Sequence, residues 1–157
     1  MAVNDRAPGA ESVSLPGDSA EQRAAERLIV AAVAEALAVS LTPRRFALQP
    51  RSWVTVDGAS DDPAVLVEAW AHQGPPKAAQ KAKVIADALK LLWLDRTQFA
   101  GRARKILALA DAAAAAHFQG RAWIAAALRD LDIEVRVVTL PETVRAALRQ
   151  AQQRQSR

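Results

Sequence analysis

The chain lacks cysteine and tyrosine, and it contains two histidines, His72 and His117. The absence of cysteine excludes disulfides, thiolate nucleophiles and cysteine-based metal sites together. Two histidines are too few for a histidine-rich zinc site within one chain. A bound metal would therefore need oxygen ligands from aspartate and glutamate, and such hard ligands favour Mg²⁺ or Mn²⁺.

Long apolar runs are absent as well. No stretch of about 18 uncharged apolar residues, the minimum for a membrane span, occurs in the chain. The first residues include Asp5 and Glu11 and contain no apolar core of signal-peptide length. We therefore expect a cytoplasmic protein that does not contact a membrane.

The composition indicates one folded domain with a basic surface. The 157 residues, 51% of them hydrophobic, suffice for one core. The net charge of +4 comes from 16 arginines and 5 lysines against 17 acids. A basic balance is compatible with DNA as a partner, although ordinary solubility charge explains it as simply.

The chain divides into a tail and a domain. Residues 1–19 are rich in Pro, Gly, Ser and Asp, which predicts a disordered N-terminal tail. Residues 20–157 are expected to form a single α/β domain. It begins with a helix over residues 20–40, for which Ser19 and Gln22 predict a capping box.

Alternating residues predict a β-hairpin next. Strands are expected over 52–57 and 64–71, joined by a turn over 58–63 and paired antiparallel. In the first strand, Val54 and Val56 face one way, and Trp53, Thr55 and Asp57 face the other.

The second half alternates helices and strands. We expect a helix over 77–94, a strand over 105–110, a helical segment over 111–131, a strand over 133–140 and a basic C-terminal helix over 141–155. A strand, helix and strand in succession predict parallel pairing. The expected fold is a three-layer-like α/β sandwich with a mixed central sheet of about four strands flanked by helices.

The helix over 77–94 carries a narrow polar stripe made of Gln80, Lys83, Asp87 and Lys90. The rest of its circumference is mostly apolar, which predicts a helix that is buried on most sides. The stripe would then face a cleft or a thin strip of solvent.

Glu68 lies in the middle of the second strand, between Leu66 and Trp70 on its own face. A carboxylate in such a position is partly desolvated and needs a cation, a metal or a proton. Asp57 on the neighbouring strand and the lysines of the following helix are the candidates to meet it.

This order of helix, hairpin with an acid on each strand, helix and strand resembles the PD-(D/E)XK superfamily. The resemblance covers about residues 20–140 and implies the restriction-endonuclease-like fold and a Mg²⁺-dependent nuclease that acts on DNA, either weakly active or catalytically degenerate. Matched position by position, Asp57 is the first acid and Glu68 the second. Glu26 matches an additional glutamate ligand of some branches, and Gln80 matches a glutamine on the helix after the motif.

The sequence departs from the family pattern where the motif lysine would stand, two residues after Glu68, because that position is Trp70. Some branches carry this lysine on the following helix, where Lys83 or Lys90 could take its part. Asp61 and Asp62 are alternative first acids in the expected turn.

The resemblance thus implies a set of site residues. The implied catalytic residues are Asp57, Glu68 and Lys83, and the implied ligands of Mg²⁺ or Mn²⁺ are Asp57, Glu68 and Glu26. The remaining cleft residues are Gln80, Asp87, Lys90, Trp70 and His72.

Two other functions stay open. In a non-catalytic interaction module on the same fold, Glu68 would form a structural ion pair with Lys83 or Lys90. In an α/β domain of unrelated ancestry, the stripe of Lys83, Asp87 and Lys90 would bind a partner, although its spacing also suits a salt-bridge ladder within the helix. A protein partner or a homodimer paired through the strand over 133–140 is compatible with either function.

Overall fold

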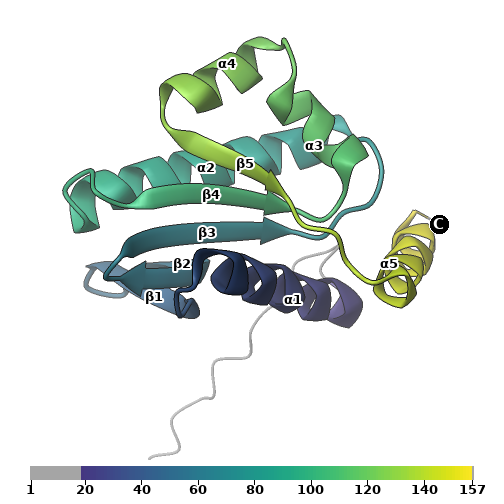
Figure 1. The fold of residues 1–157 in the computed structure, drawn as a ribbon, viewed down its shortest axis with the longest axis horizontal. Coiled ribbons are helices and arrows are strands. Elements are labelled where there is room, and N and C mark those ends of the chain that lie inside the picture. The colour runs from purple at the N-terminus through teal and green to yellow at the C-terminus, as the bar shows by residue number, and fades with distance from the viewer. Residues whose placement is uncertain (1–18, 157) are drawn as a thin grey trace, which may run out of the picture.

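The computed structural model describes residues 19–156, so the expected tail over 1–19 lies outside the described residues except for Ser19. The described part contains five helices and five strands in the order α1-β1-β2-β3-α2-β4-α3-α4-β5-α5 (Figure 1). The helices are α1 (Ala20–Leu37), α2 (Ala78–Gln98), α3 (Ala112–Gln119), α4 (Trp123–Asp130) and α5 (Glu142–Gln155). The strands are β1 (Thr42–Gln49), β2 (Ser52–Asp61), β3 (Ala64–Trp70), β4 (Arg104–Leu109) and β5 (Ile133–Val137).

The strands form one mixed sheet in the order β1-β2-β3-β4-β5. The pairs β1–β2 and β2–β3 are antiparallel, while β3–β4 and β4–β5 are parallel. The expected antiparallel hairpin and the parallel second half of the sheet are therefore confirmed. β3 is the middle strand, and Val65 to Trp70 are all buried because helices cover both of its faces.

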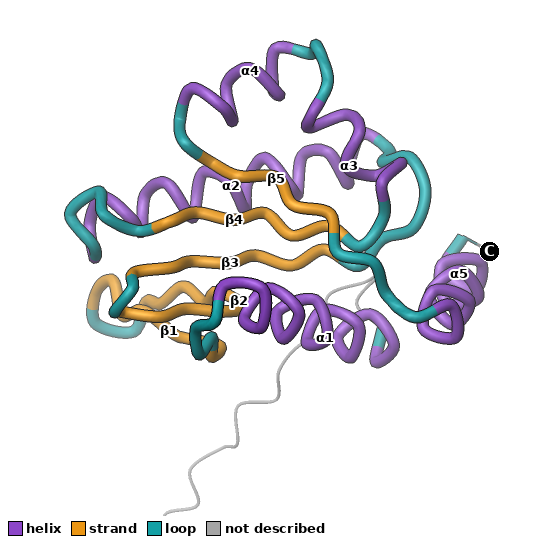
Figure 2. Tube along the Cα trace, in the orientation of Figure 1, coloured by secondary structure: helices purple, strands orange, loops and turns teal. Residues whose placement is uncertain are grey.

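Helices cover both sides of the sheet (Figure 2). One core packs α2, α3 and α4 against the first face. The other core packs α1 and α5 against the opposite face. The expectation of an α/β protein with a mixed sheet between helices is thereby confirmed. Over residues 19–156, no helix combines the length and the apolar character that a membrane span requires.

The expected number of about four strands is wrong, because the sheet has five. The missing strand is β1, whose sequence contains Pro43, Arg44 and Arg45. β1 lies at the edge of the sheet, where a proline removes no needed ladder hydrogen bond and charged side chains reach solvent. These residues hide the alternation that identifies an interior strand.

The expected turn over 58–63 is also wrong in extent, because β2 continues to Asp61. Arg44 pairs with Val56 whereas Thr42 pairs with Ala59, so β2 has one extra residue between these pairs. This is a β-bulge. It turns Asp57 toward α2, where the charges of Lys83 and Lys90 act on its carboxylate. Strict alternation had placed Asp57 on the opposite face.

Gly58, next to Asp57 in the bulge, lies directly against α1. A Cβ atom at Gly58 would lie 2.8 Å from Cγ1 of Val30 on α1 and 3.3 Å from Cβ of Leu41. The lack of a side chain at Gly58 therefore lets α1 pack directly on the backbone of β2.

Three further elements differ in extent from the expectation. The segment over 111–131 forms two helices separated at Gly120, and β5 ends at Val137. α2 extends to Gln98, and it is not buried on most sides. Its outer side leaves Ile85, Leu89 and Trp93 exposed, with Leu89 at 65%, because the described elements cover only the side of α2 that faces the sheet.

Candidate functional site

β2 and β3 separate at the position of the two candidate acids. Their ladder runs from Asp61↔Ala64 to Gly58↔Val67 and stops there. Asp57 and Glu68 occupy the next position of each strand. Oδ2 of Asp57 accepts a hydrogen bond of 2.8 Å from the backbone N–H of Ala69, so the side chain replaces a ladder bond and holds Asp57 against β3.

Glu68 is buried beside a lysine of α2. Its side chain is 7% exposed, and Nζ of Lys90 lies 2.8 Å from its Oε1. Beyond this contact with Lys90, no residue of the described range gives Oε1 a hydrogen bond. Glu68 is thus a buried carboxyl group whose Oε1 depends on a single lysine, and a carboxylate with so few partners is costly in a protein interior.

Burial raises the pKa of Glu68 to about 8, and the charge of Asp57 adds to this effect while Lys90 opposes it. Burial also raises the pKa of Asp57, against the opposing effect of the Ala69 N–H. At pH 7 Glu68 therefore carries a proton in most molecules. Burial thus disfavours the charged form of both acids.

Asp87 holds the two lysines of the stripe. Its Oδ2 lies 3.3 Å from Nζ of Lys83, and its Oδ1 lies 3.5 Å from Nζ of Lys90. The intrahelical ladder suggested by the spacing is therefore present. Lys90, with a side chain 22% exposed, is the lysine in contact with Glu68, whereas the side chain of Lys83 is 53% exposed.

Glu26 lies on α1, on the other side of the sheet from α2, and its charge acts on Lys83. Burial lowers the pKa of Lys83, but the carboxylates of Asp87, Glu26 and Glu68 outweigh it, and the pKa of Lys83 is raised overall. Glu26 also accepts a hydrogen bond of 3.5 Å from Nε2 of Gln22 on α1. Its charge thus acts on the stripe of α2.

Trp70, His72 and Gln80 form a connected group beside the acids. The ring of His72 stacks on Trp70 with 5.0 Å between centroids, and its Nδ1 lies 3.1 Å from Nε2 of Gln80. Gln80 also accepts a hydrogen bond from the N–H of Lys77 at the start of α2. Burial lowers the pKa of His72. These contacts fix the start of α2 against the end of β3, where Trp70 is buried.

The alternative first acids lie elsewhere. Asp61 forms an exposed ion pair of 2.6 Å with Arg44 on β1. Asp62 is in the turn between β2 and β3. Of these acids, Asp57 is the one whose charge acts on Glu68.

The sequence did not reveal a second buried ion pair. Nζ of Lys105 on β4 lies 2.9 Å from Oδ2 of Asp95 on α2, and both side chains are less than a tenth exposed. Oδ1 of Asp95 accepts a hydrogen bond of 2.7 Å from the N–H of Ala103. Helical spacing gives no signal for this pair, because it bridges the loop between α2 and β4. Unlike Glu68, Asp95 is satisfied at both oxygens.

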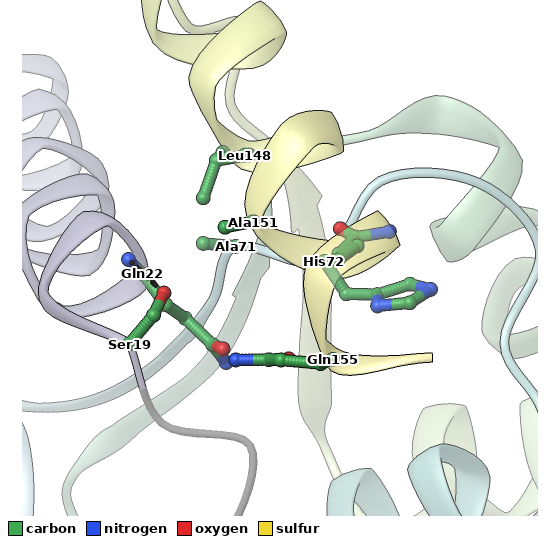
Figure 3. A pocket seen from close by; sticks show the side chains of 8 residues that line it. Ser19, Gln22, Ala71, His72, Leu148, Ala151 and Gln155 are labelled. Carbon is green, nitrogen blue, oxygen red and sulfur yellow. Dashed lines mark hydrogen bonds between the residues drawn. The ribbon is translucent and has the colours of Figure 1, made fainter. Parts of the chain in front are cut away.

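A small pocket lies between the start of α1, the end of β3 and α5, and neither Asp57 nor Glu68 lines it (Figure 3). It is lined by Ser19, Gln22, Ala71, His72, Leu148, Ala151, Gln152 and Gln155. Within residues 19–156, no cluster of three or more His, Asp or Glu side chains is arranged to hold a metal ion. A metal at Asp57 and Glu68 would rest on two carboxylates together with other oxygen ligands.

The chain matches no protein-family model, no curated protein sequence and no solved structure.

Proposed function

We propose that Asp57, Glu68 and Lys90 form a divergent PD-(D/E)XK-like site that hydrolyses phosphodiester bonds in DNA with Mg²⁺ or Mn²⁺. The observation that carries the proposal is the pairing of two acids where adjacent strands separate, with the buried Glu68 in contact with Lys90. The succession of α1, the antiparallel strands, α2 and β4 supports the restriction-endonuclease-like assignment.

The residues present fit a hard divalent cation. Oε1 of Glu68 is a buried acceptor whose one described contact is Lys90, and Asp57 supplies the second carboxylate. The N–H of Ala69 points to Asp57, and in a strand the carbonyl group of a residue leaves on the same side as its N–H. Two carboxylates and a main-chain oxygen form a donor set that Mg²⁺ accepts while it keeps several waters.

Each residue would have a distinct part in the reaction. When bound, the metal would lower the pKa of a bound water and neutralise charge on the phosphate. Glu68 must lose its proton to become a ligand, and Asp57 is held in place by the Ala69 N–H. Lys90, released from Glu68, would stabilise the negative charge that develops on the phosphate. Lys90 therefore takes the part that the sequence had assigned to Lys83, because it is the lysine in contact with Glu68.

Metal binding is tested first by calorimetry. Titration of Mn²⁺ in two buffers of different ionisation enthalpy measures proton release, and we expect close to one proton per metal at about pH 7, the proton of Glu68. The affinity should rise by up to about tenfold per pH unit and level off above the pKa of about 8. Glu68→Gln should abolish binding, while Glu134→Gln, a change in an acid of β5, should leave it intact.

Cleavage is tested on plasmid and single-stranded DNA with Mn²⁺. We expect cleavage by the native chain and by Glu134→Gln, and a loss of at least about 100-fold in Glu68→Gln, Asp57→Asn and Lys90→Met. Cleavage that survives in Glu68→Gln, or the absence of Mn²⁺ binding to the native chain, would contradict the proposal.

The direct contact between Lys90 and Glu68 supports a second candidate, a non-catalytic interaction module in which this pair is structural. In that case Glu68→Gln changes the free energy of unfolding, and neither the native chain nor Glu68→Gln binds Mn²⁺. The same titration therefore separates the two candidates.

A further inference from the structure

An exposed tryptophan lies on the β1–β2 hairpin, on the face turned away from α2. The register pairs Arg45 with Thr55 and Ala47 with Trp53 on this face, and all four residues are exposed. We call these four residues the hairpin face. Trp53 is 55% exposed, although tryptophan in a strand usually packs against a core.

Arg45 fixes the indole ring in place. Its guanidinium carbon lies 4.8 Å from the centre of the Trp53 ring, a cation–π contact between diagonal positions of neighbouring strands. The ring therefore has a neighbour that orients it while about half of its surface still reaches solvent.

The hairpin is positively charged. From Pro43 to Val56 the sequence has three arginines and no acid. Arg44 is paired with Asp61, whereas neither Arg45 nor Arg51 forms an ion pair with any residue of the described range 19–156. The hairpin thus carries two guanidinium groups without an ion pair in the described range, of which Arg45 contacts Trp53.

Arg51 occupies a position that normally favours glycine or asparagine. Its φ angle is 68°, and it follows Pro50 in the turn between β1 and β2. A left-handed conformation is unfavourable for a long side chain, and such residues concentrate where function requires them. In this turn the conformation puts a cation at the tip of the hairpin.

We propose that the hairpin face binds single-stranded nucleic acid, with an unpaired base stacked on Trp53 and phosphates held by Arg45 and Arg51. An aromatic ring between cations is the arrangement that such strands require, because every base offers a π-face and every linkage a charge. In a duplex the bases stay stacked and cannot lie on an indole ring.

A protein partner fits this surface less well. The hairpin face has one aromatic side chain and no large aliphatic one, whereas protein interfaces bury clusters of apolar anchors. The outer side of α2, with Ile85, Leu89 and Trp93, has that apolar character. The hairpin face is also distinct from the acids, since Val54 and Val56, which alternate with Trp53, pack in the core beneath α2.

Binding of a labelled oligothymidylate of about 16 nucleotides, a length within the range for single-strand-binding folds, is measured by fluorescence anisotropy in EDTA. EDTA removes divalent cations, so the outcome does not depend on the proposed metal site. We expect Trp53→Ala to raise Kd by about 5- to 150-fold, the range for one lost stacking contact, and Trp53→Phe to restore most of the affinity. Trp123→Ala is the matched control, because Trp123 is 74% exposed on α4.

The arginines are tested by salt titration of the same complex. Arg51→Ala should reduce the slope of log affinity against log salt concentration by about 0.7, the value for one phosphate contact to a single strand. Arg121→Ala, an exposed arginine between α3 and α4, should leave the slope unchanged. Thermal melts of each variant check that the fold is retained.

Three results would overturn the proposal: no binding by the native chain at low salt, equal affinity of Trp53→Ala and the native chain, or an equal loss in Trp123→Ala. Binding to a duplex of the same length that is as tight, and as sensitive to Trp53→Ala, would overturn the preference for single strands.

Discussion

At the scale of single residues, the structure contains two buried acids that differ in how many partners their carboxylate oxygens have. Asp95 has one oxygen on Lys105 and the other on the N–H of Ala103. Glu68 has Lys90 as the one described partner of its Oε1, and a second acid nearby. Satisfied buried pairs serve the fold, whereas perturbed and incompletely paired acids are characteristic of functional sites. This difference identifies Glu68, rather than Asp95, as the candidate functional acid.

The raised pKa of Glu68 makes stability depend on pH. The ordinary value for glutamate is 4.5 and the folded value is about 8, so between them the folded state binds more protons than the unfolded state. The contribution of Glu68 to the free energy of unfolding therefore falls as pH rises through this window, by at most about 1.4 kcal/mol per pH unit. Glu68→Gln removes this dependence. As pH rises toward about 8, the free energy of unfolding of the variant should therefore increase relative to that of the native chain, and above about pH 8 the difference between them should stay constant.

Urea denaturation of both proteins across this window measures the difference. Glu134→Gln serves as the control, because its arginine partners lower the pKa of Glu134 and move its own effect to more acidic solution. If the free energies of unfolding of Glu68→Gln and the native chain differ by a constant amount from about pH 5 to pH 8, the pKa of Glu68 is not raised.

At the scale of elements, α2 depends on the ion pair that joins its last turns to β4. Lys105→Met would leave the buried carboxylate of Asp95 without its cation, and breaking such a pair costs about 3–5 kcal/mol of unfolding free energy. Arg104→Met breaks the neighbouring pair with Glu134, whose side chains are 49% and 32% exposed, and should cost less than about 1 kcal/mol. Chemical denaturation of the two variants compares them directly, and equal losses would show that burial does not set the strength of these pairs.

The contact between α1 and the β2 bulge can be tested in the same way. Gly58→Ala puts a Cβ atom 2.8 Å from Cγ1 of Val30, and we expect a loss of about 1–3 kcal/mol. Val30→Ala removes the clashing methyl groups, so Gly58→Ala should cost much less in that background. A double-mutant cycle from urea denaturation measures this coupling, and additive losses would place the strain of Gly58→Ala elsewhere.

Periodicity and turn residues predicted most elements of this fold but not the details that shape the candidate site. The apolar run of β3 between turn residues and the spacing of α1 are local signals, and they predicted those elements nearly at their true bounds. The bulge at Asp57 depends on pairing with β1 and on the approach of α1 at Gly58, which are non-local. Glu68 contacts Lys90 rather than Lys83 because of how α2 packs across β3, and a helical wheel gives no information on that packing.

At the scale of the whole molecule, two cores share one sheet, and α5 closes the core on the side of α1. Leu148 and Ala151 of α5 are buried in this contact. Gln152 accepts a hydrogen bond from the N–H of Gln73 and donates one to its carbonyl oxygen, and Arg154 pairs with Glu21 of α1. The last helix is therefore fastened both to the first helix and to the end of the central strand, which should make its unfolding inseparable from that of the sheet.

Leu148→Ala tests this coupling. We expect it to lower the free energy of unfolding by about 2–4 kcal/mol, because it opens a cavity between α5 and the α1 side of the sheet. Gln153→Ala, an exposed change on the same helix, should stay within about 0.5 kcal/mol of the native chain. Urea denaturation is followed by far-ultraviolet circular dichroism, which reports on all helices, and by tryptophan fluorescence, which reports on β2, β3, α2 and α4 but not on α5. If the protein unfolds as one unit, the two signals coincide in both variants; an early loss of helical signal before any change in fluorescence would instead show that α5 unfolds independently.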